Sequence, residues 1–340
     1  MPRTSLADFA ALPYPILDVR APAEFAQGHQ PGAISLPLFS DDERALIGTA
    51  YKRVSQEQAV HLGLKYFGPK MADMAKQAKK LAPGREVRLH CWRGGMRSQA
   101  VQWLLELSGF TVHLLDGGYK AYRQAVLATL GQPRQWWVLG GPTGSGKTEV
   151  LHQLAAAGQP VLDLEGLACH KGSSFGGIGQ PAAPTQEQFE NNLAVALAQL
   201  PAHAPAWLED ESRQIGRLVL PGNLYDELRA APCYVLDTPR AERITRLAAE
   251  YGPTQDPALL GAAIERLRKR LGGLATRDAL AAVEAGNFEL MVALVLDYYD
   301  KAYDYGMEQR RAASTPALPF SESFFDAAPA ANGAGSAVNN

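Results

Sequence analysis

The sequence lacks any long apolar run. No stretch of the 340 residues approaches the ~20 consecutive apolar residues of a transmembrane helix. The N-terminal segment has no apolar core followed by a small-residue cleavage site, as a secretory signal would. With 46% hydrophobic and 20% charged residues, the composition is that of an ordinary globular protein. We therefore expect a cytoplasmic protein without a membrane partner.

Cysteine is also scarce. The three cysteines, Cys91, Cys169 and Cys233, lie far apart, and no C-x-x-C pair occurs. An odd, dispersed set excludes a disulfide framework and a cysteine zinc site, and no metal-ligating cluster is expected. Each free thiol is therefore either a packing residue or a chemical group.

An excess of charge of one sign is missing as well. The formal net charge is −2, so no global positive field would attract nucleic acid, and an RNA partner would need a local basic patch. The candidate patch comprises Arg266, Lys269 and Arg270 in one predicted helix, with Arg243, Arg246 and Arg277 nearby in sequence. A solvated helix face explains the same pattern equally well.

The order of apolar runs and helical patterns predicts two α/β domains. Short strands are expected at 15–19, 86–91 and 111–116, with helices such as 71–81 and 98–108 between them. This alternation is typical of a parallel sheet covered by helices. After a linker at 131–133, strands are expected at 135–141, 160–164, 205–210 and 232–237, followed by helices at 239–251, 257–271, 274–285 and 287–303. We predict domains at 1–131 and 132–311, and a disordered tail at 312–340.

The stretch "GGPTGSGKT" predicts a phosphate-binding loop. Its residues from Gly141 to Thr148 match G-x-x-x-x-G-K-[ST], after an apolar strand and before a helix. Such a loop directs backbone N–H groups and a lysine at an anion, and its threonine hydroxyl suits Mg²⁺. The predicted phosphate-binding residues are Gly141, Gly144, Ser145, Gly146, Lys147 and Thr148. A di- or triphosphate is expected, but the loop does not specify ATP.

Acidic residues follow two strands of the second predicted domain. "WLEDE" contains Glu209, Asp210 and Glu211 at a strand end, where a metal-contacting acid, here Asp210 or Glu211, accompanies many phosphate-binding loops, although a solvated strand end fits as well. Glu165 precedes His170 in the glycine-containing stretch 163–177, a suitable place for substrate contacts. We expect Glu165, Glu209 and Asp210 to support the site.

The stretch "HCWRGGMRS" predicts a second anion loop. Cys91 follows an apolar strand, and two glycines and two arginines come before the next helix. Amide N–H groups, the helix dipole and Arg93 or Arg97 would stabilise a thiolate there. The spacing C-x5-R is compatible with a phosphatase and with a sulfurtransferase, while a buried structural cysteine is the non-catalytic alternative.

The preceding segment favours the sulfurtransferase reading. "LDVRAPAEFAQGHQPGA" resembles the opening hallmark of rhodanese-like domains, with Asp18 and Arg20 in its first part. The order of the two loops, together with "DLEGLACHKGSSFG", "EDESRQIG", "GTAYK" and "LDYYDKAYDY", resembles the tRNA 2-selenouridine synthase family from about residue 18 to about residue 306. The fold expected from this resemblance is a rhodanese-like parallel-sheet domain before a P-loop NTPase-like α/β domain with a helical C-terminal part.

The resemblance implies a transferase that acts on a wobble uridine of tRNA. It implies geranylation of 2-thiouridine by geranyl diphosphate, then replacement of the S-geranyl group by selenium from selenophosphate. Lys147 would neutralise the departing diphosphate, and Cys91, with Arg93 and Arg97, would carry selenium as a selenosulfide. Asp18 and Arg20 would support this loop. No bound prosthetic group is implied, and Mg²⁺ is an optional companion of the P-loop.

Two other functions fit the residues alone. An ATP-dependent rhodanese-type sulfurtransferase would use the P-loop to activate its substrate. A cysteine-dependent phosphatase or nucleotide-sensing regulator would use Cys91 against phosphate monoesters, or the P-loop only to sense nucleotide. tRNA binding and a preference for geranyl diphosphate over ATP distinguish the selenouridine synthase from both.

Overall fold

A computed structural model describes residues 3–252, 254–312 and 317–326. The contacts divide the chain into two compact units, Met1–Thr129 with Glu190–Val195, and Leu130–Phe189 with Ala196–Asn340. Both contain parallel sheets with helices, which confirms the predicted α/β class. No helix within the described ranges combines the length and the apolarity that crossing a membrane would require.

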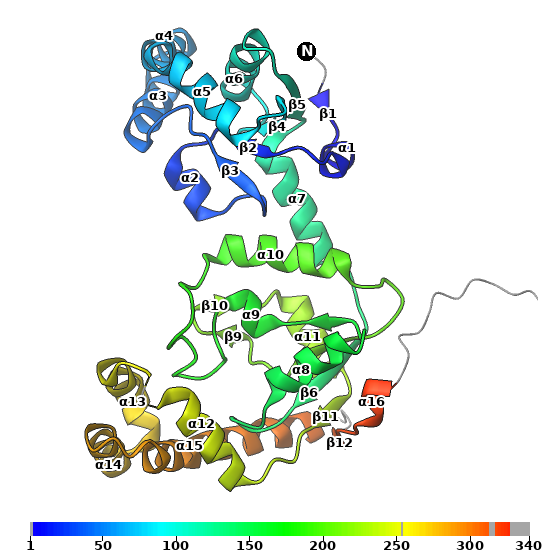
Figure 1. Cartoon of the computed structure of the whole chain (residues 1–340), viewed down its shortest axis with the longest axis vertical. Coiled ribbons are helices and arrows are strands. Elements are labelled where there is room, and N and C mark those ends of the chain that lie inside the picture. The colour runs from blue at the N-terminus through cyan, green and yellow to red at the C-terminus, as the bar shows by residue number, and fades with distance from the viewer. Residues whose placement is uncertain (1–2, 253, 313–316, 327–340) are drawn as a thin grey trace, which may run out of the picture. The chain divides into compact units, whose positions relative to one another are not determined.

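The first unit is built on a parallel five-stranded sheet with the order β1-β5-β4-β2-β3 (Figure 1). The strands are β1 (Arg3–Thr4), β2 (Ile16–Asp18), β3 (Ala33–Ser35), β4 (Glu86–His90) and β5 (Thr111–Leu115). The helices are α1 (Leu6–Ala11), α2 (Pro22–Gln27), α3 (Asp41–Arg53), α4 (Gln56–Phe67), α5 (Met71–Leu81), α6 (Met96–Leu107) and α7 (Gly118–Leu130), with a 3-10 turn at Gly68–Lys70. The strands predicted at 15–19, 86–91 and 111–116 are confirmed as β2, β4 and β5.

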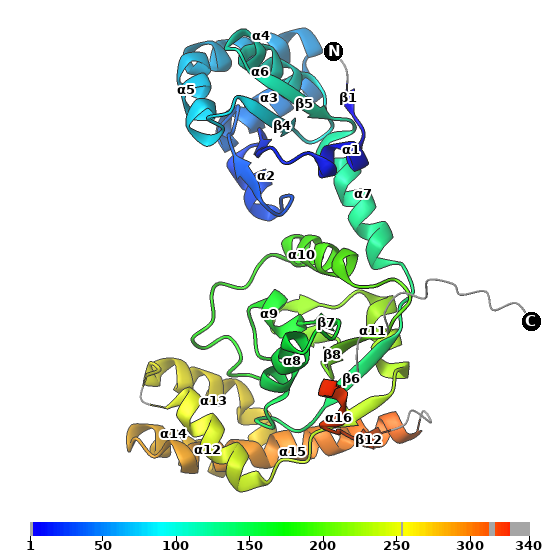
Figure 2. The same ribbon diagram turned by 45° about the vertical axis from the view of Figure 1, so that its right-hand side comes forward.

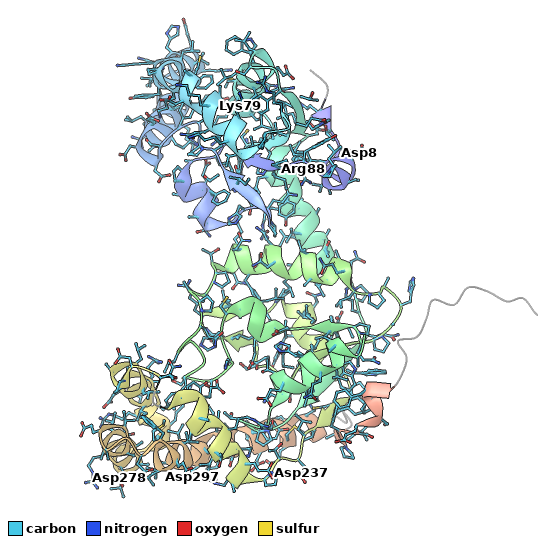
Figure 3. All side chains as sticks on the ribbon, in the orientation of Figure 1. Asp8, Lys79, Arg88, Asp237, Asp278 and Asp297 are labelled. Atoms are coloured by element: carbon cyan, nitrogen blue, oxygen red, sulfur yellow. The ribbon has the colours of Figure 1, made fainter. Side chains whose placement is uncertain are left out.

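Alternating side chains along the strands supply both faces of this sheet. Leu17 and Leu89 join a core that also takes residues from α5 and α6, whereas Ile16 and Leu115 pack with Phe9 of α1. Arg88, labelled in Figure 3, ties β4 to the α1 region through hydrogen bonds from Nε to Tyr14 O at 2.7 Å and from Nη1 to Phe9 O at 3.0 Å. These contacts fix the strand whose end carries Cys91.

The second unit contains a parallel sheet with the order β12-β11-β6-β8-β7, and a small antiparallel pair (Figure 2). The strands are β6 (Trp136–Gly140), β7 (Val161–Leu162), β8 (Ala206–Glu209), β9 (Gln214–Ile215), β10 (Leu218–Val219), β11 (Cys233–Val235) and β12 (Ala317–Pro319). The helices are α8 (Lys147–Ala156), α9 (Leu164–Ala168), α11 (Gly222–Ala230), α12 (Arg240–Tyr251), α13 (Pro257–Leu271), α14 (Gly273–Glu284), α15 (Phe288–Ala312) and α16 (Ser323–Asp326). Helix α10 (Gln186–Gln199) is divided, because its residues Glu190–Val195 belong to the first unit and the rest to the second. The predicted strands of this part are β6, β7, β8 and β11.

Helices α12 to α15 form the predicted helical part of the second unit and share a core of their own. Leu247 of α12, Leu260 of α13, Ala282 of α14 and Met291 of α15 contribute to it. Asp297, labelled on α15 in Figure 3, accepts a hydrogen bond from Arg240 of α12 at 2.5 Å. The helix pair α12 and α15 is therefore held by apolar packing and by ion pairs.

The prediction of a disordered tail from residue 312 is wrong for residues 317–326. Strand β12 pairs in parallel with β11, from Ala317 opposite Cys233 to Pro319 opposite Val235. The physical reason is aromatic packing, because the ring centroids of Phe324 lie 5.1 Å from those of Trp207 and 4.7 Å from those of Tyr234. Residue 312 ends α15, and residues 313–316 and 327–340 of the predicted tail lie outside the described ranges.

Candidate functional site

Cys91 lies where β4 ends, in a loop that leads directly into α6. Its side chain is buried, with 3% of the residue exposed, and Sγ lies 3.2 Å from Ser98 Oγ. Ser98 was not predicted as a site residue, although it stands in the first turn of α6, where a hydroxyl can reach back to the loop. The predicted strand–loop–helix context of Cys91 is confirmed.

The surroundings of Cys91 favour its thiolate. Burial by itself would raise the pKa of the Cys91 thiol, but the Ser98 hydroxyl, the charge of Arg97 and the backbone N–H groups of Arg93 and Ser98 together lower it below its ordinary value. The two other cysteines differ. Burial raises the pKa of Cys233 to about 12, and Cys169 ends α9 in the left-handed conformation with φ 50°. The lowered pKa distinguishes Cys91 from Cys233.

Arg97 is held by a carboxylate from another element. Its Nη1 donates to Glu24 Oε2 at 2.6 Å, and Glu24 also accepts from the backbone N–H of Ala21 at 3.0 Å, at the start of α2. Burial opposes the charge of Glu24, but these bonds keep the pKa of its carboxyl below the usual range. Arg93 is exposed in the loop. Arg97 is thus positioned beside Cys91, and Arg93 projects into solvent.

Asp18 and Arg20 form a buried ion pair beside this loop. Arg20 Nη2 lies 2.6 Å from Asp18 Oδ2 and donates to Gly28 O at 2.7 Å, and its guanidinium lies 3.7 Å from the ring centroid of Tyr119. Among the residues that the structure describes, no hydrogen bond or ion pair joins Asp18 or Arg20 to Cys91. Their geometry suits a structural role, in which they hold the turn after β2 and the start of α7.

The Cys91 loop packs closely against the start of α7. The backbone N–H of Tyr119 donates to Cys91 O at 2.9 Å, and that of Lys120 donates to Trp92 O at 2.9 Å. A Cβ on Gly118, which has φ 60°, would lie 2.5 Å from Cys91 O and 2.5 Å from Gly94 N. The close approach requires glycine at position 118.

The predicted phosphate-binding loop joins β6 to α8. Gly144 and Gly146 have φ of 81° and 87°, and α8 begins at Lys147. Lys147 Nζ donates to Gly141 O at 2.8 Å, and the buried Ser145 Oγ has no hydrogen-bond partner among the described residues. The unbonded N–H groups of the first helical turn and this hydroxyl can therefore serve an anion.

Two arginines of α12 hold the carbonyls of this loop. Arg246 Nη1 donates to Gly144 O at 2.9 Å, and Arg243 Nη1 donates to Thr143 O at 3.2 Å. Arg243 is 6% exposed and also pairs with Asp300 at 2.7 Å. Both arginines belong to the predicted tRNA patch. The structure instead buries Arg243, so it has no free face for RNA, and places Arg246 at the P-loop.

Glu165 connects the P-loop to a group of buried acids. Its Oε2 accepts from the Thr148 hydroxyl at 2.9 Å. Burial, assisted by the charge of Glu165, raises the pKa of Glu211 well above its ordinary value, although Lys147 opposes this rise. Burial and the charges of Asp163 and Glu165 likewise raise the pKa of Glu209. Glu165 therefore faces the anion loop, and burial disfavours the charged form of Glu209.

Glu209 and Asp210 occupy places away from the loop's threonine. Glu209 is fully buried and accepts from the backbone N–H of Leu164 at 3.0 Å. Asp210 accepts from Arg310 at 2.5 Å, and Arg310 is itself fully buried. Asp210 lines the cavity over the P-loop, together with its neighbour Glu211, the other acid predicted to lie near a metal. Of the two acids that follow β8, Glu211 is the one whose pKa is affected by the charges of both Glu165 and Lys147.

A cavity of about 640 Å³ lies over the P-loop, within the second unit. Its lining includes Lys147, Thr148, Glu165 and Glu211, together with Lys171. Lys171 Nζ pairs with Glu250 at 2.5 Å. The predicted phosphate-binding residues and Glu165 are thus gathered around one space, whose size suits a small organic ligand.

The remaining cations of the predicted RNA patch are scattered along α13 and α14. Arg266 donates to Ser174 O at 2.8 Å, Arg270 donates to Tyr298 Oη at 3.2 Å, and Arg277 pairs with Asp278 at 3.0 Å. Lys269 is exposed. Burial, assisted by the charge of Arg266, lowers the pKa of His170.

Comparison with known proteins matches both units. A family model described as a rhodanese-like domain matches residues 5–125, and one described as a tRNA 2-selenouridine synthase AAA domain matches residues 134–317. A protein from Marinobacter nauticus named tRNA 2-selenouridine synthase is 38% identical over 333 residues, which cover 87% of this chain and 89% of that protein. The like-named protein from Hydrogenovibrio crunogenus is 37% identical over 331 residues, covering 87% and 90%.

A third relative of that name, from Nitrosomonas europaea, is 40% identical over 245 residues, which cover 70% of this chain and 63% of the relative. The two family matches occur in the order predicted from the two anion loops. The resemblance inferred from the motifs is therefore confirmed, and the chain belongs to the tRNA 2-selenouridine synthase family.

Proposed function

We propose that this chain converts 2-thiouridine in tRNA into 2-selenouridine in two steps, geranylation at sulfur and then exchange for selenium. The observation that supports this most is the presence, in one member of this family, of a P-loop with a 640 Å³ cavity and a cysteine with a lowered pKa. The P-loop suits the diphosphate of a prenyl donor. The cysteine suits a substitution at carbon.

The first step would take place at the P-loop cavity. The sulfur of 2-thiouridine attacks C1 of geranyl diphosphate, the C1–O bond breaks, and its electron pair leaves with the diphosphate. The base then loses the N3 proton to water, which leaves a neutral S-geranyl product. Lys147, Ser145 and the first N–H groups of α8 would stabilise the charge on the departing diphosphate.

The second step would use Cys91. Selenium in selenophosphate is already at the selenide level, so the selenosulfide expected from the sequence would need a two-electron oxidant that neither co-substrate supplies. A balanced route lets the Cys91 thiolate add to C2 and expel geranyl thiol. Hydrogen selenide, released when water attacks the phosphorus of selenophosphate, then adds to C2 and displaces Cys91. Alkylated sulfur is a better leaving group than the free thiocarbonyl, so geranylation comes first.

Arg93 and Arg97 would attract selenophosphate to the Cys91 loop. Arg97 is bonded to Glu24 and acts on Cys91 through its charge, whereas the exposed Arg93 is free to meet the anion. An exposed cation beside a buried thiolate allows the anion to be held without neutralising the thiolate.

Mg²⁺ and tRNA complete the proposal. Thr148 Oγ1 and Glu165 are oxygen donors 2.9 Å apart, and together with diphosphate oxygens and water they fit the hard-ligand chemistry of Mg²⁺. Bound Mg²⁺ would neutralise diphosphate charge. No group of three or more metal-ligating side chains occurs in the part of the chain that the structure describes. tRNA would be bound by local cations, and we place the reaction in the cytoplasm.

The purified protein provides a direct test. With tRNA containing 2-thiouridine and geranyl diphosphate, we expect S-geranyl-2-thiouridine in nucleoside mass spectrometry, and addition of selenophosphate should convert it to 2-selenouridine. ATP should not replace geranyl diphosphate. Formation of 2-selenouridine without geranyl diphosphate would show that the alkylation step is not part of the mechanism.

A further inference from the structure

One part of the lining of the P-loop cavity is apolar and aromatic, and we call it the apolar wall. Its residues come from α12 and α15 and are Leu247, Tyr251, Tyr299, Ala302, Tyr303 and Met307. Those of α15 recur at intervals of three and four, so they lie on one face of the helix. Arg246 and Glu250 of α12 also line the cavity, so its lining combines the phosphate-binding loop, charged side chains and this apolar and aromatic set.

The apolar wall continues into a narrow crevice behind it. The crevice has a volume of about 20 Å³ and shares Leu247, Tyr251 and Tyr299 with the cavity. Its far side consists of apolar residues, including Phe175, Met291 and Leu296. The main cavity therefore contains the volume that a ligand would occupy, and the crevice adjoins the apolar part of its lining.

The position of the wall is fixed by contacts that also fix the P-loop. Arg243 of α12 bonds both to Thr143 O in the loop and to Asp300 of α15, and Ser174 N donates to Tyr299 Oη at 2.7 Å. A Cβ on Gly144 would lie 2.7 Å from Leu247 Cδ1, so the wall begins immediately beside the loop's backbone. A ligand held by the loop would meet this wall directly.

We infer that the apolar face of α15, together with Leu247 and Tyr251, is a hydrocarbon subsite that seats the chain of a prenyl diphosphate whose diphosphate lies on the P-loop. This inference rests on the proposed function and specifies which part of the second unit selects the donor. A free phosphate or a polar triphosphate gains nothing from such a wall. Burial of a hydrocarbon chain favours binding in proportion to the area removed from water.

Equilibrium binding to the full chain tests the subsite without depending on catalysis. The probes are inorganic diphosphate, geranyl diphosphate and ATP, measured by calorimetry. We expect geranyl diphosphate to bind at least tenfold more tightly than inorganic diphosphate, and more tightly than ATP. Equal affinities for the two diphosphates, or tighter binding of ATP, would overturn the inference.

Ala302 is the position at which to block the wall, because its side chain is small, exposed and part of the lining. Ala302→Trp should fill the space, and Ala302→Glu should place charge there. Both should reduce the affinity for geranyl diphosphate to that for inorganic diphosphate. Lys301→Trp, an exposed neighbour outside the lining, should keep the tenfold preference. An unchanged preference in both Ala302 variants would refute the assignment.

The transfer assay separates this inference from the proposed function. One outcome is that tighter binding depends on the geranyl group and is lost in the Ala302 variants, but the parent protein transfers no geranyl group to tRNA. That outcome would support the subsite and refute the reaction. Geranyl transfer by a protein that binds both diphosphates equally would support the reaction and refute the subsite.

Discussion

At the scale of single residues, the lowered pKa of Cys91 results from opposed contributions. Burial disfavours its thiolate, whereas Ser98, Arg97 and two amide groups favour it, and the favourable contributions prevail. Arg97 contributes through charge, and Glu24 keeps it in place at 2.6 Å. The sequence predicts Cys91 and Arg97 from their spacing. It could not predict the pairing with Glu24, because residues 73 positions apart leave no local pattern.

Replacement of Arg97 tests this balance. Without the cation, the pKa of Cys91 rises, so the thiolate fraction falls at pH values below it, and alkylation of Cys91 by iodoacetamide near neutral pH should slow roughly tenfold in Arg97→Met. The pH–rate profile, read from the Cys91 peptide by mass spectrometry, should shift to higher pH. Lys79→Met, at an exposed position of α5 labelled in Figure 3, is the control and should keep the parent profile. An identical profile for Arg97→Met would show that Arg97 does not affect the thiolate.

At the scale of elements, both anion loops are strand-to-helix turns that depend on contacts with a third element. The Cys91 loop is held by α7, and the P-loop is held by α12. The sequence predicts the strands, the loops and the following helices, because each has a local pattern. The supporting contacts come from elsewhere in the chain, which is why Arg243 and Arg246 are read from sequence as surface cations. Aromatic packing of β12 and α16 escapes prediction for the same reason.

Gly118 provides a test of the contact between the Cys91 loop and α7. Gly118→Ala places a Cβ 2.5 Å from two backbone atoms at a φ of 60°, which we expect to cost about 1–3 kcal/mol locally. Hydrogen exchange of the peptide 86–98 should accelerate by about fivefold or more, since 1.4 kcal/mol corresponds to a factor of ten.

Gly84→Ala is the matched control, because a Cβ at that position would meet no atom within 4 Å. It should leave the exchange of the 86–98 peptide unchanged. Equal exchange in the Gly118 and Gly84 variants would mean that α7 does not hold the loop.

At the scale of the whole molecule, two compact units each contain one anion loop. The order of a rhodanese-like domain and a P-loop domain follows from the sequence motifs and is confirmed by the family matches. The apolar wall of the cavity could not be read as a site, since its residues are separated in sequence and α15 looks like an ordinary amphipathic helix. Because the net charge is −2, the proposed recognition of tRNA would depend on local cations.

We propose that the two loops catalyse successive steps on one tRNA nucleoside. The most direct measurement is nucleoside mass spectrometry of tRNA from cells that lack this gene and carry either the parent chain or one of two variants. With Cys91→Ala, S-geranyl-2-thiouridine should accumulate and 2-selenouridine should be absent. With Lys147→Ala, 2-thiouridine should persist and the S-geranyl form should fall at least about a hundredfold. Normal 2-selenouridine in the Cys91→Ala strain, or normal S-geranyl product with Lys147→Ala, would contradict this division of labour.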